Sequence, residues 1–178
     1  MPYAISLLFD DTAAAHVRRM WCALAEQVGS DDAIRLGYPP HMTLAVLPDT
    51  APIADVEEAA FRVTGKWTTL SVVLAGLGVF PRTRPVIWAA PVVTSELLAR
   101  HADLHAALMP FGVHPHYRPG SWVPHVTLSQ EGAVSADRAI EAAGSAWSGP
   151  VSAECRQVEL VRFRPVDVLR SQALLEVQ

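Results

Sequence analysis

The chain has 178 residues, a formal net charge of −4 and a hydrophobic fraction of 51%. This composition fits a folded globular protein and excludes a disordered one. No apolar run reaches the roughly 18 to 20 residues of a membrane helix, and the start of the chain lacks the features of a signal peptide. Proteins that follow many phosphates along a nucleic acid carry a basic face. We therefore expect a cytoplasmic protein without membrane contact that reads at most an RNA end or a small nucleotide.

The apolar spacing along the chain alternates between strand and helix periods. Strands are expected, in chain order, over residues 3–9, 41–47, 68–80, 85–93, 122–128, 151–163 and 171–177. Helices are expected over residues 12–28, 52–63, 95–109 and 135–143. A turn at residues 81–84 joins two of the strands in a hairpin, and Ser135 is a suitable N-cap for the last helix. The same order of elements recurs in the second part of the chain, which predicts two similar lobes.

The cysteines and histidines of the chain do not make up a complete metal-binding motif. Cys22 and Cys155 lie far apart, and we predict that both are buried free thiols. His101 and His105 stand one helical turn apart, which is a spacing that binds metals. They have no third ligand nearby in the sequence and share their face with leucines, so we predict a packed helix face instead. We expect neither a metal nor a cofactor.

One short motif occurs twice. Residues 40–44 read PHMTL and residues 124–128 read PHVTL, and the two copies are separated by close to half the chain. In a strand of period two, His41 and Thr43 point to one face while their apolar neighbours point to the other. Each copy therefore offers one imidazole and one hydroxyl on the same side of a strand. The proline before each histidine cannot donate a ladder hydrogen bond and suits the beginning of a strand.

This set of groups suits the hydrolysis or transesterification of a phosphodiester. One of His41 and His125 can act as the base that activates water or a hydroxyl, and the other as the acid that protonates the leaving oxygen, since histidine titrates near neutral pH. The hydroxyls of Thr43 and Thr127 can donate to the non-bridging phosphate oxygens. Because the two motifs are nearly identical, the sequence leaves open which histidine is the base and which is the acid.

The two H-x-T motifs in two similar lobes resemble the 2H phosphoesterase superfamily, and within it the 2′-5′ RNA ligase and RNA 2′,3′-cyclic phosphodiesterase group. The resemblance covers almost the whole chain. It implies an α+β fold over residues 1–178, a single bilobal, pseudo-symmetric domain in which two antiparallel sheets flank a central cleft with helices outside. It also implies catalysis by His41 and His125, phosphate binding by Thr43 and Thr127, and metal-independent action on a 2′,3′-cyclic phosphate or a 2′-5′ linkage.

The chain departs from the pattern of the better-known members at two places. Residues 45–47 are Ala-Val-Leu where those members tend to carry an aromatic residue, and Gln130 stands where they often carry an arginine. The resemblance implies that this arginine is a charged contact to phosphate. Another arginine of the chain can make that contact; the candidates are Arg82, Arg84, Arg118, Arg162 and Arg164.

Several aromatic side chains near the motifs have two interpretations. Trp122 could stack on a base or be buried in a strand, and Tyr38 and Phe80 carry the same ambiguity. His114 and His116 lie in a loop before the second motif, where rim contacts to a substrate are common.

Three functional hypotheses follow from these observations. The first is an enzyme acting on RNA or a small nucleotide, with no obligatory protein partner and as a monomer. The second keeps the chemistry but takes a small cyclic phosphate, such as an ADP-ribose derivative, as the substrate. The third is a non-catalytic module on the same fold that binds a nucleotide or an RNA end.

Overall fold

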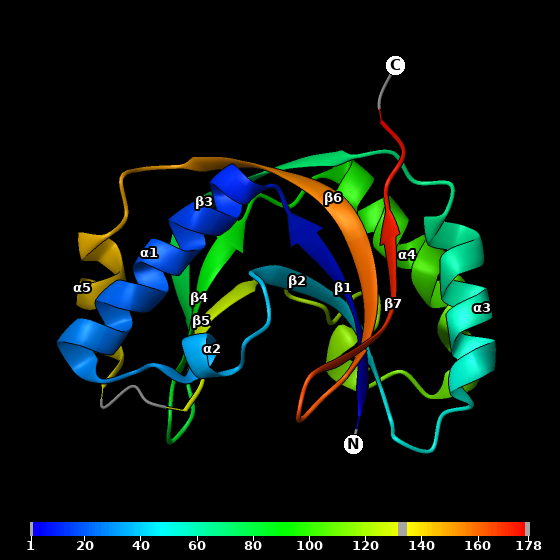
Figure 1. Ribbon diagram of the computed structural model, residues 1–178, viewed down its shortest axis with the longest axis horizontal. Coiled ribbons are helices and arrows are strands. Elements are labelled where there is room, and N and C mark those ends of the chain that lie inside the picture. Colours follow the sequence, from blue (N-terminus) through cyan, green and yellow to red (C-terminus); the bar gives the residue numbers. More distant parts are fainter. Residues whose placement is uncertain (1, 132–134, 177–178) are drawn as a thin grey trace.

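The computed structural model describes residues 2–131 and 135–176 of the chain (Figure 1). The strands are β1 (Tyr3–Phe9), β2 (His41–Leu47), β3 (Leu70–Phe80), β4 (Val86–Pro91), β5 (Val126–Ser129), β6 (Val151–Arg162) and β7 (Asp167–Ala173). The helices are α1 (Asp11–Val28), α2 (Asp32–Arg35), α3 (Ile53–Thr64), α4 (Ser95–Leu108) and α5 (Ala136–Ser145), with 3₁₀ turns η1 (Met109–Phe111) and η2 (Pro115–Tyr117). The predicted α+β class is confirmed.

All of the strand pairs are antiparallel, and they follow the order β2-β1-β6-β3-β4-β5, with β7 also paired to β6. The long strand β6 joins two halves: its first residues pair with β3, whereas its later residues lie between β1 and β7. The two sheets expected from the sequence are therefore the halves of one continuous hydrogen-bonded sheet.

The helices cover the outside of the two halves. Helices α1 and α5 pack together on one side, and α3 and α4 pack together on the other, with β6 arching between them (Figure 1). Their apolar faces and the strands enclose a core of fully buried side chains, among them Leu24, Met42, Leu74 and Leu104. At about 25 cal/mol per Å² of apolar surface, this burial supplies the main stabilising free energy of the fold.

The sheet curls so that its two ends meet. β2 and β5 are the first and last strands of the sheet order, yet they contact one another. Irregularities in the register, which increase local twist and bending, occur in β1, β3 and β4 along this path. The curvature brings the two motifs together, since β2 carries the first motif and β5 the second.

Several boundaries differ from the predicted ones. The predicted strand 122–128 is replaced by the shorter β5, because residues 122–125 are irregular and Pro124 has no N–H for a ladder bond. The last strand, β7, begins and ends four residues before the predicted range 171–177, whose final residue, Val177, lies outside the described residues. The one-turn helix α2 was not predicted, because four residues carry no periodic signal. Of the two cysteines, Cys155 is buried as predicted, whereas Cys22 is exposed on α1 and that prediction is wrong.

Within the described ranges, no helix is both long and apolar enough to cross a membrane.

Asp10 joins the first helix to the central strand and provides a test of the fold. Its Oδ1 accepts hydrogen bonds from the backbone N–H groups of Thr12 and Ala13 at 2.9 and 3.0 Å, which caps α1, and its Oδ2 accepts from the N–H of Glu154 in β6 at 2.7 Å. We expect Asp10→Ala to lower the free energy of unfolding by about 1–2 kcal/mol, the usual cost of a lost N-cap. Urea denaturation measures this change. Asp11→Ala, at the exposed neighbouring position, is the matched control, and equal effects of the two substitutions would contradict the assignment.

Candidate active site

Both motifs open into one cleft of about 730 Å³ between the ends of the sheet. His41 is the first residue of β2, and His125 directly precedes β5. Their side chains and those of Thr43 and Thr127 all line the cleft. The volume is in the range of sites for small molecules and cofactors, which are mainly apolar with a few polar groups. The four residues expected to form the site are thus brought together.

The two histidines are held in the same way. The Nδ1 of His41 lies 2.7 Å from the carbonyl oxygen of Pro39, and the Nδ1 of His125 lies 2.7 Å from that of Val123. Each bond spans a proline, whose fixed φ helps to turn the preceding carbonyl back towards the ring. Because a carbonyl only accepts, each Nδ1 carries the hydrogen. Each Nε2 has no hydrogen-bond partner among the described residues, so it is free to give or take a proton in the cleft.

Burial dominates the electrostatics of the pair. Burial lowers the pKa of His41 below its ordinary value; the bond to Pro39 and the charge of Glu159 oppose this change, whereas the neighbouring His125 adds to it. Burial likewise lowers the pKa of His125, opposed only by its bond to Val123. The neutral form of each ring is favoured because a charged imidazolium loses solvation when it is buried.

Aromatic rings fix the planes of both imidazoles. The ring of Tyr38 lies 4.6 Å from that of His41, and the ring of Phe80 meets His125 edge-on at 5.1 Å. Trp88 stacks on Phe80 at 5.0 Å and also contacts His125. A side chain at Gly78, the register partner of Trp88, would clash with the indole, since its Cβ would lie only 2.3 Å from the ring. Glycine at this position allows the tryptophan to lie against β3 and support His125.

Each motif threonine is anchored by a tryptophan from outside its own strand. The indole N–H of Trp122 donates to the carbonyl of Thr43 at 3.1 Å, and that of Trp21 donates to the carbonyl of Thr127 at 3.1 Å. β2 and β5 are edge strands, whose open sides present unpaired backbone groups. The indole bonds occupy these groups and fix the two threonines at the cleft.

A polar row crosses the sheet beside the first motif. Thr43, Ser6 and Glu159 are register partners on β2, β1 and β6. The hydroxyls of Ser6 and Thr43 lie 3.4 Å apart, and Glu159 is only 7% exposed. Gln157 donates to the Glu159 carboxylate at 2.6 Å, and the charge of this carboxylate reaches His41. Among the described residues, no comparable carboxylate acts on His125, so the two halves of the site differ in this respect.

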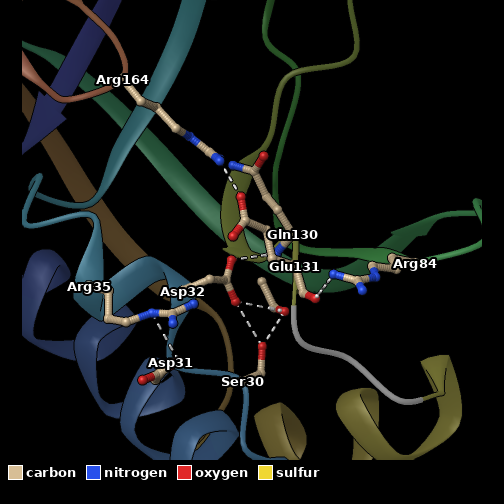
Figure 2. A network of polar contacts seen from close by, with 9 residues as sticks. Ser30, Asp31, Asp32, Arg35, Arg84, Gln130, Glu131 and Arg164 are labelled. Atoms are coloured by element: carbon tan, nitrogen blue, oxygen red, sulfur yellow. Dashed lines mark hydrogen bonds and ion pairs between the residues drawn. The ribbon is translucent and has the colours of Figure 1, made fainter.

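Asp32 fixes the end of the second motif strand (Figure 2). Its carboxylate accepts from the backbone N–H of Gln130 at 2.7 Å and from the hydroxyl of Ser30 at 2.9 Å, and Ser30 and Ser129 are also hydrogen-bonded to each other. The sequence did not single out Asp32, Ser6, Glu159 or Trp88, because their roles depend on register and on contacts between distant segments.

The predicted substrate contacts separate into two groups. Arg82, Gln130 and Trp122 line the cleft, and Arg84 lines a cavity that adjoins it. Arg118 does not line the cleft, because its Nε donates to the carbonyl of Val113 at 3.0 Å.

The other two arginine candidates separate in the same way. Arg162 does not line the cleft and forms an ion pair with Asp167, with 2.5 Å between Nη2 and Oδ2. Arg164 lines the cleft and pairs with Glu131.

The remaining aromatic and histidine candidates have clear positions. Trp122 is not in a strand; it is half-buried in the cleft wall and stacks on His101, with ring centroids 3.9 Å apart. His101 and His105 are buried and bond to carbonyl oxygens of Tyr117 and Leu44, which agrees with a packed helix face. His114 and His116 line the cleft and are exposed, as a rim position requires.

The curled antiparallel sheet with one H-x-T motif at each end is the arrangement expected for the 2H phosphoesterase superfamily. The family model described as the 2′-5′ RNA ligase superfamily matches residues 9–167, and the chain belongs to this superfamily.

Solved structures share the fold at low sequence identity. TT0787 of Thermus thermophilus is 17% identical with a TM-score of 0.69, covering 100% of both chains. E. coli LigT complexed with 3′-AMP is 18% identical with a TM-score of 0.65, covering 98% of this chain and 99% of LigT. LigT complexed with ATP is 16% identical with a TM-score of 0.62, covering 98% of each chain. Among curated proteins, none matches the sequence significantly.

The Glu159 carboxylate provides a test of the site's electrostatics. We expect Glu159→Gln to lower the pKa of His41 further, because it removes a negative charge that favours the imidazolium. The pKa of His125 should stay the same, so it serves as an internal reference. NMR titration of the two imidazoles measures both values. Glu154→Gln, on the same strand, is the control, and an unchanged or raised His41 pKa in Glu159→Gln would refute the assignment.

Proposed function

We propose that the protein is a metal-independent phosphodiesterase that opens a 2′,3′-cyclic phosphate, or cleaves or joins a 2′-5′ linkage, at an RNA end or in a small nucleotide. The observation that carries the proposal is the matched pair of imidazoles in one cleft, each anchored through Nδ1 and free at Nε2. The nucleotide complexes of E. coli LigT support a nucleotide as the ligand class.

The proposed reaction uses the two rings in opposite protonation states. The neutral histidine takes a proton from water at its Nε2, and the water oxygen forms a bond to phosphorus. The bond from phosphorus to one ribose oxygen breaks, and the Nε2–H of the protonated histidine supplies the proton to this leaving oxygen. The two histidines exchange protonation states in the step, and proton exchange with solvent restores them. The same groups can run the reverse direction, in which a ribose hydroxyl takes the place of water.

The threonines stabilise the charge on the phosphate. In the proposed complex, the hydroxyls of Thr43 and Thr127 donate to the non-bridging oxygens, which carry more negative charge in the transition state than in the ground state. The tryptophan bonds to their backbone carbonyls hold both residues before substrate binds. Such preorganisation lowers the barrier because little rearrangement is needed during the reaction.

The role of the two histidines is tested by substitution. We expect His41→Ala and His125→Ala each to lower kcat on a 2′,3′-cyclic nucleotide by roughly 10²- to 10⁴-fold, the usual contribution of a positioned acid or base. The assay is run with excess chelator, under which the unmodified protein should keep its activity. His16→Ala, on α1 away from the cleft lining, is the matched control. Activity that needs added metal, or survives both substitutions, would refute the proposal, and binding without turnover would favour a non-catalytic module.

The pH profile tests the opposite protonation states. We expect a bell-shaped dependence of kcat/KM, because the reaction needs one neutral and one protonated imidazole. Burial lowers the pKa of both His41 and His125, so the acid form is lost at a lower pH than for an exposed histidine. The maximum should therefore lie below about pH 6.5, the ordinary histidine pKa. A rate that rises steadily through neutral pH would contradict this assignment.

A further inference from the structure

A second cavity adjoins the catalytic cleft and is lined by arginines. It has a volume of about 540 Å³, and Arg82, Arg84 and Arg164 lie in its wall. Arg82, Gln130 and Arg164 line both this cavity and the cleft that contains the two histidines. The two spaces thus share part of their lining, and the second one lies directly beside the space in which a ligand at the histidines would sit.

We propose that Arg82, Arg84 and Arg164 form an anion subsite that binds a second phosphate of the substrate, next to the phosphate that reacts. The inference rests on the proposed function and adds to it the class of substrate: a ribonucleotide that carries at least one phosphate beyond the reacting one.

The lining of the second cavity is positively charged, whereas the whole chain has a negative net charge. Three guanidinium groups face one carboxylate, that of Glu131, in a protein with a net charge of −4. Arg82 is exposed and has neither an ion pair nor a hydrogen bond in the described part of the chain, so its donors are available to a ligand. Guanidinium groups present several N–H donors in a planar fork that matches the oxygens of a phosphate.

Two of the three arginines of the proposed subsite are held in place by contacts to Glu131. Arg84 donates through Nη1 to the backbone carbonyl of Glu131 at 3.1 Å, and Arg164 pairs with the Glu131 carboxylate. In Figure 2 the two arginines approach Glu131 from opposite sides, with the Gln130 amide beside Arg164. The Arg164–Glu131 pair shows that this guanidinium takes an oxyanion partner at this position. A phosphodiester carries the same single charge as a carboxylate and a terminal phosphate carries more, and the oxygens of either can compete for the same donors.

The geometry also accounts for Gln130. An arginine at this position would be a fourth cation in a lining that already contains Arg82, Arg84 and Arg164. Glutamine keeps a hydrogen-bonding side chain there without adding charge. The cation that the sequence lacks after its second motif is thus supplied from two other segments, the turn between β3 and β4 and the turn between β6 and β7.

A comparison of substrates tests the subsite through a ratio. Adenosine 2′,3′-cyclic phosphate has only the reacting phosphate, whereas its 5′-phosphorylated form and the dinucleotide ending in the same cyclic phosphate have a second one. We expect Arg82→Gln and Arg164→Gln each to lower the ratio of kcat/KM, two-phosphate over one-phosphate substrate, by roughly 5- to 20-fold, as for a charge-assisted contact at an exposed site. Arg62→Gln, in an exposed pair with Glu58 on α3, should keep the ratio. A ratio that stays the same in both cleft variants would overturn the subsite.

The source of the second phosphate follows from the two longer substrates. A ratio that depends on the arginines for the dinucleotide only assigns the subsite to an internal phosphodiester of RNA. A dependence for the 5′-phosphorylated mononucleotide only assigns it to a terminal phosphate of a small nucleotide. Either result supports the subsite.

Binding measurements separate a failure of the subsite from a failure of the proposed function. Calorimetry with adenosine 3′-monophosphate and adenosine 3′,5′-bisphosphate needs no turnover. The bisphosphate should bind more tightly, and Arg82→Gln and Arg164→Gln should remove that advantage. Glu131→Gln should have the opposite effect and increase it several-fold, because a competing carboxylate is removed, and added salt should reduce it. Equal affinity for both ligands would overturn the subsite, whatever the activity assay shows.

Discussion

The contact between the two outermost strands of the sheet is the constraint on which the site depends. β2 and β5 stand at opposite ends of the strand order, and only the curl of the sheet through β6 and β3 brings them together. A flat sheet would hold the two motifs as far apart as the architecture allows. Because sheets twist with a fixed hand and bend at register irregularities, the same backbone feature shapes the core and creates the cleft.

The curl brings the ends of the sheet together without pairing them, so β2 and β5 keep open edges, and side chains from other segments bond to these edges. Trp122 and His105 bond to carbonyls of β2, while Trp21 and Asp32 bond to backbone groups at β5 and the residue after it. An unpaired buried backbone group costs about 1–3 kcal/mol, so these bonds stabilise the strands that carry the motifs. They also hold the threonines and histidines in place, which links the stability of the edges to the geometry of the site.

The symmetric part of the candidate site can be predicted from the sequence, whereas the asymmetric part cannot. His41 and His125 are found from the repeat alone, because each copy is a local pattern of alternating faces. Glu159 and Ser6 escape notice, since their position beside His41 depends on which strands pair and in what register. The choice among several arginines fails for the same reason. The α+β class follows from local periodicity, whereas the joining of two expected sheets into one depends on the length of β6.

The position of β6 in the chain decides when, during synthesis, the sheet can be completed. This strand joins both halves of the sheet, yet it follows both motifs in the sequence, and it pairs with β1 from Tyr3 to Phe9. During synthesis, both histidines leave the ribosome before the strand that brings their strands together. Pairing between such distant segments is typical of proteins that fold slowly. Because the two halves of the sheet are joined through residues 151–162, a chain that ends before them carries both motifs without the strand that joins their two halves of the sheet.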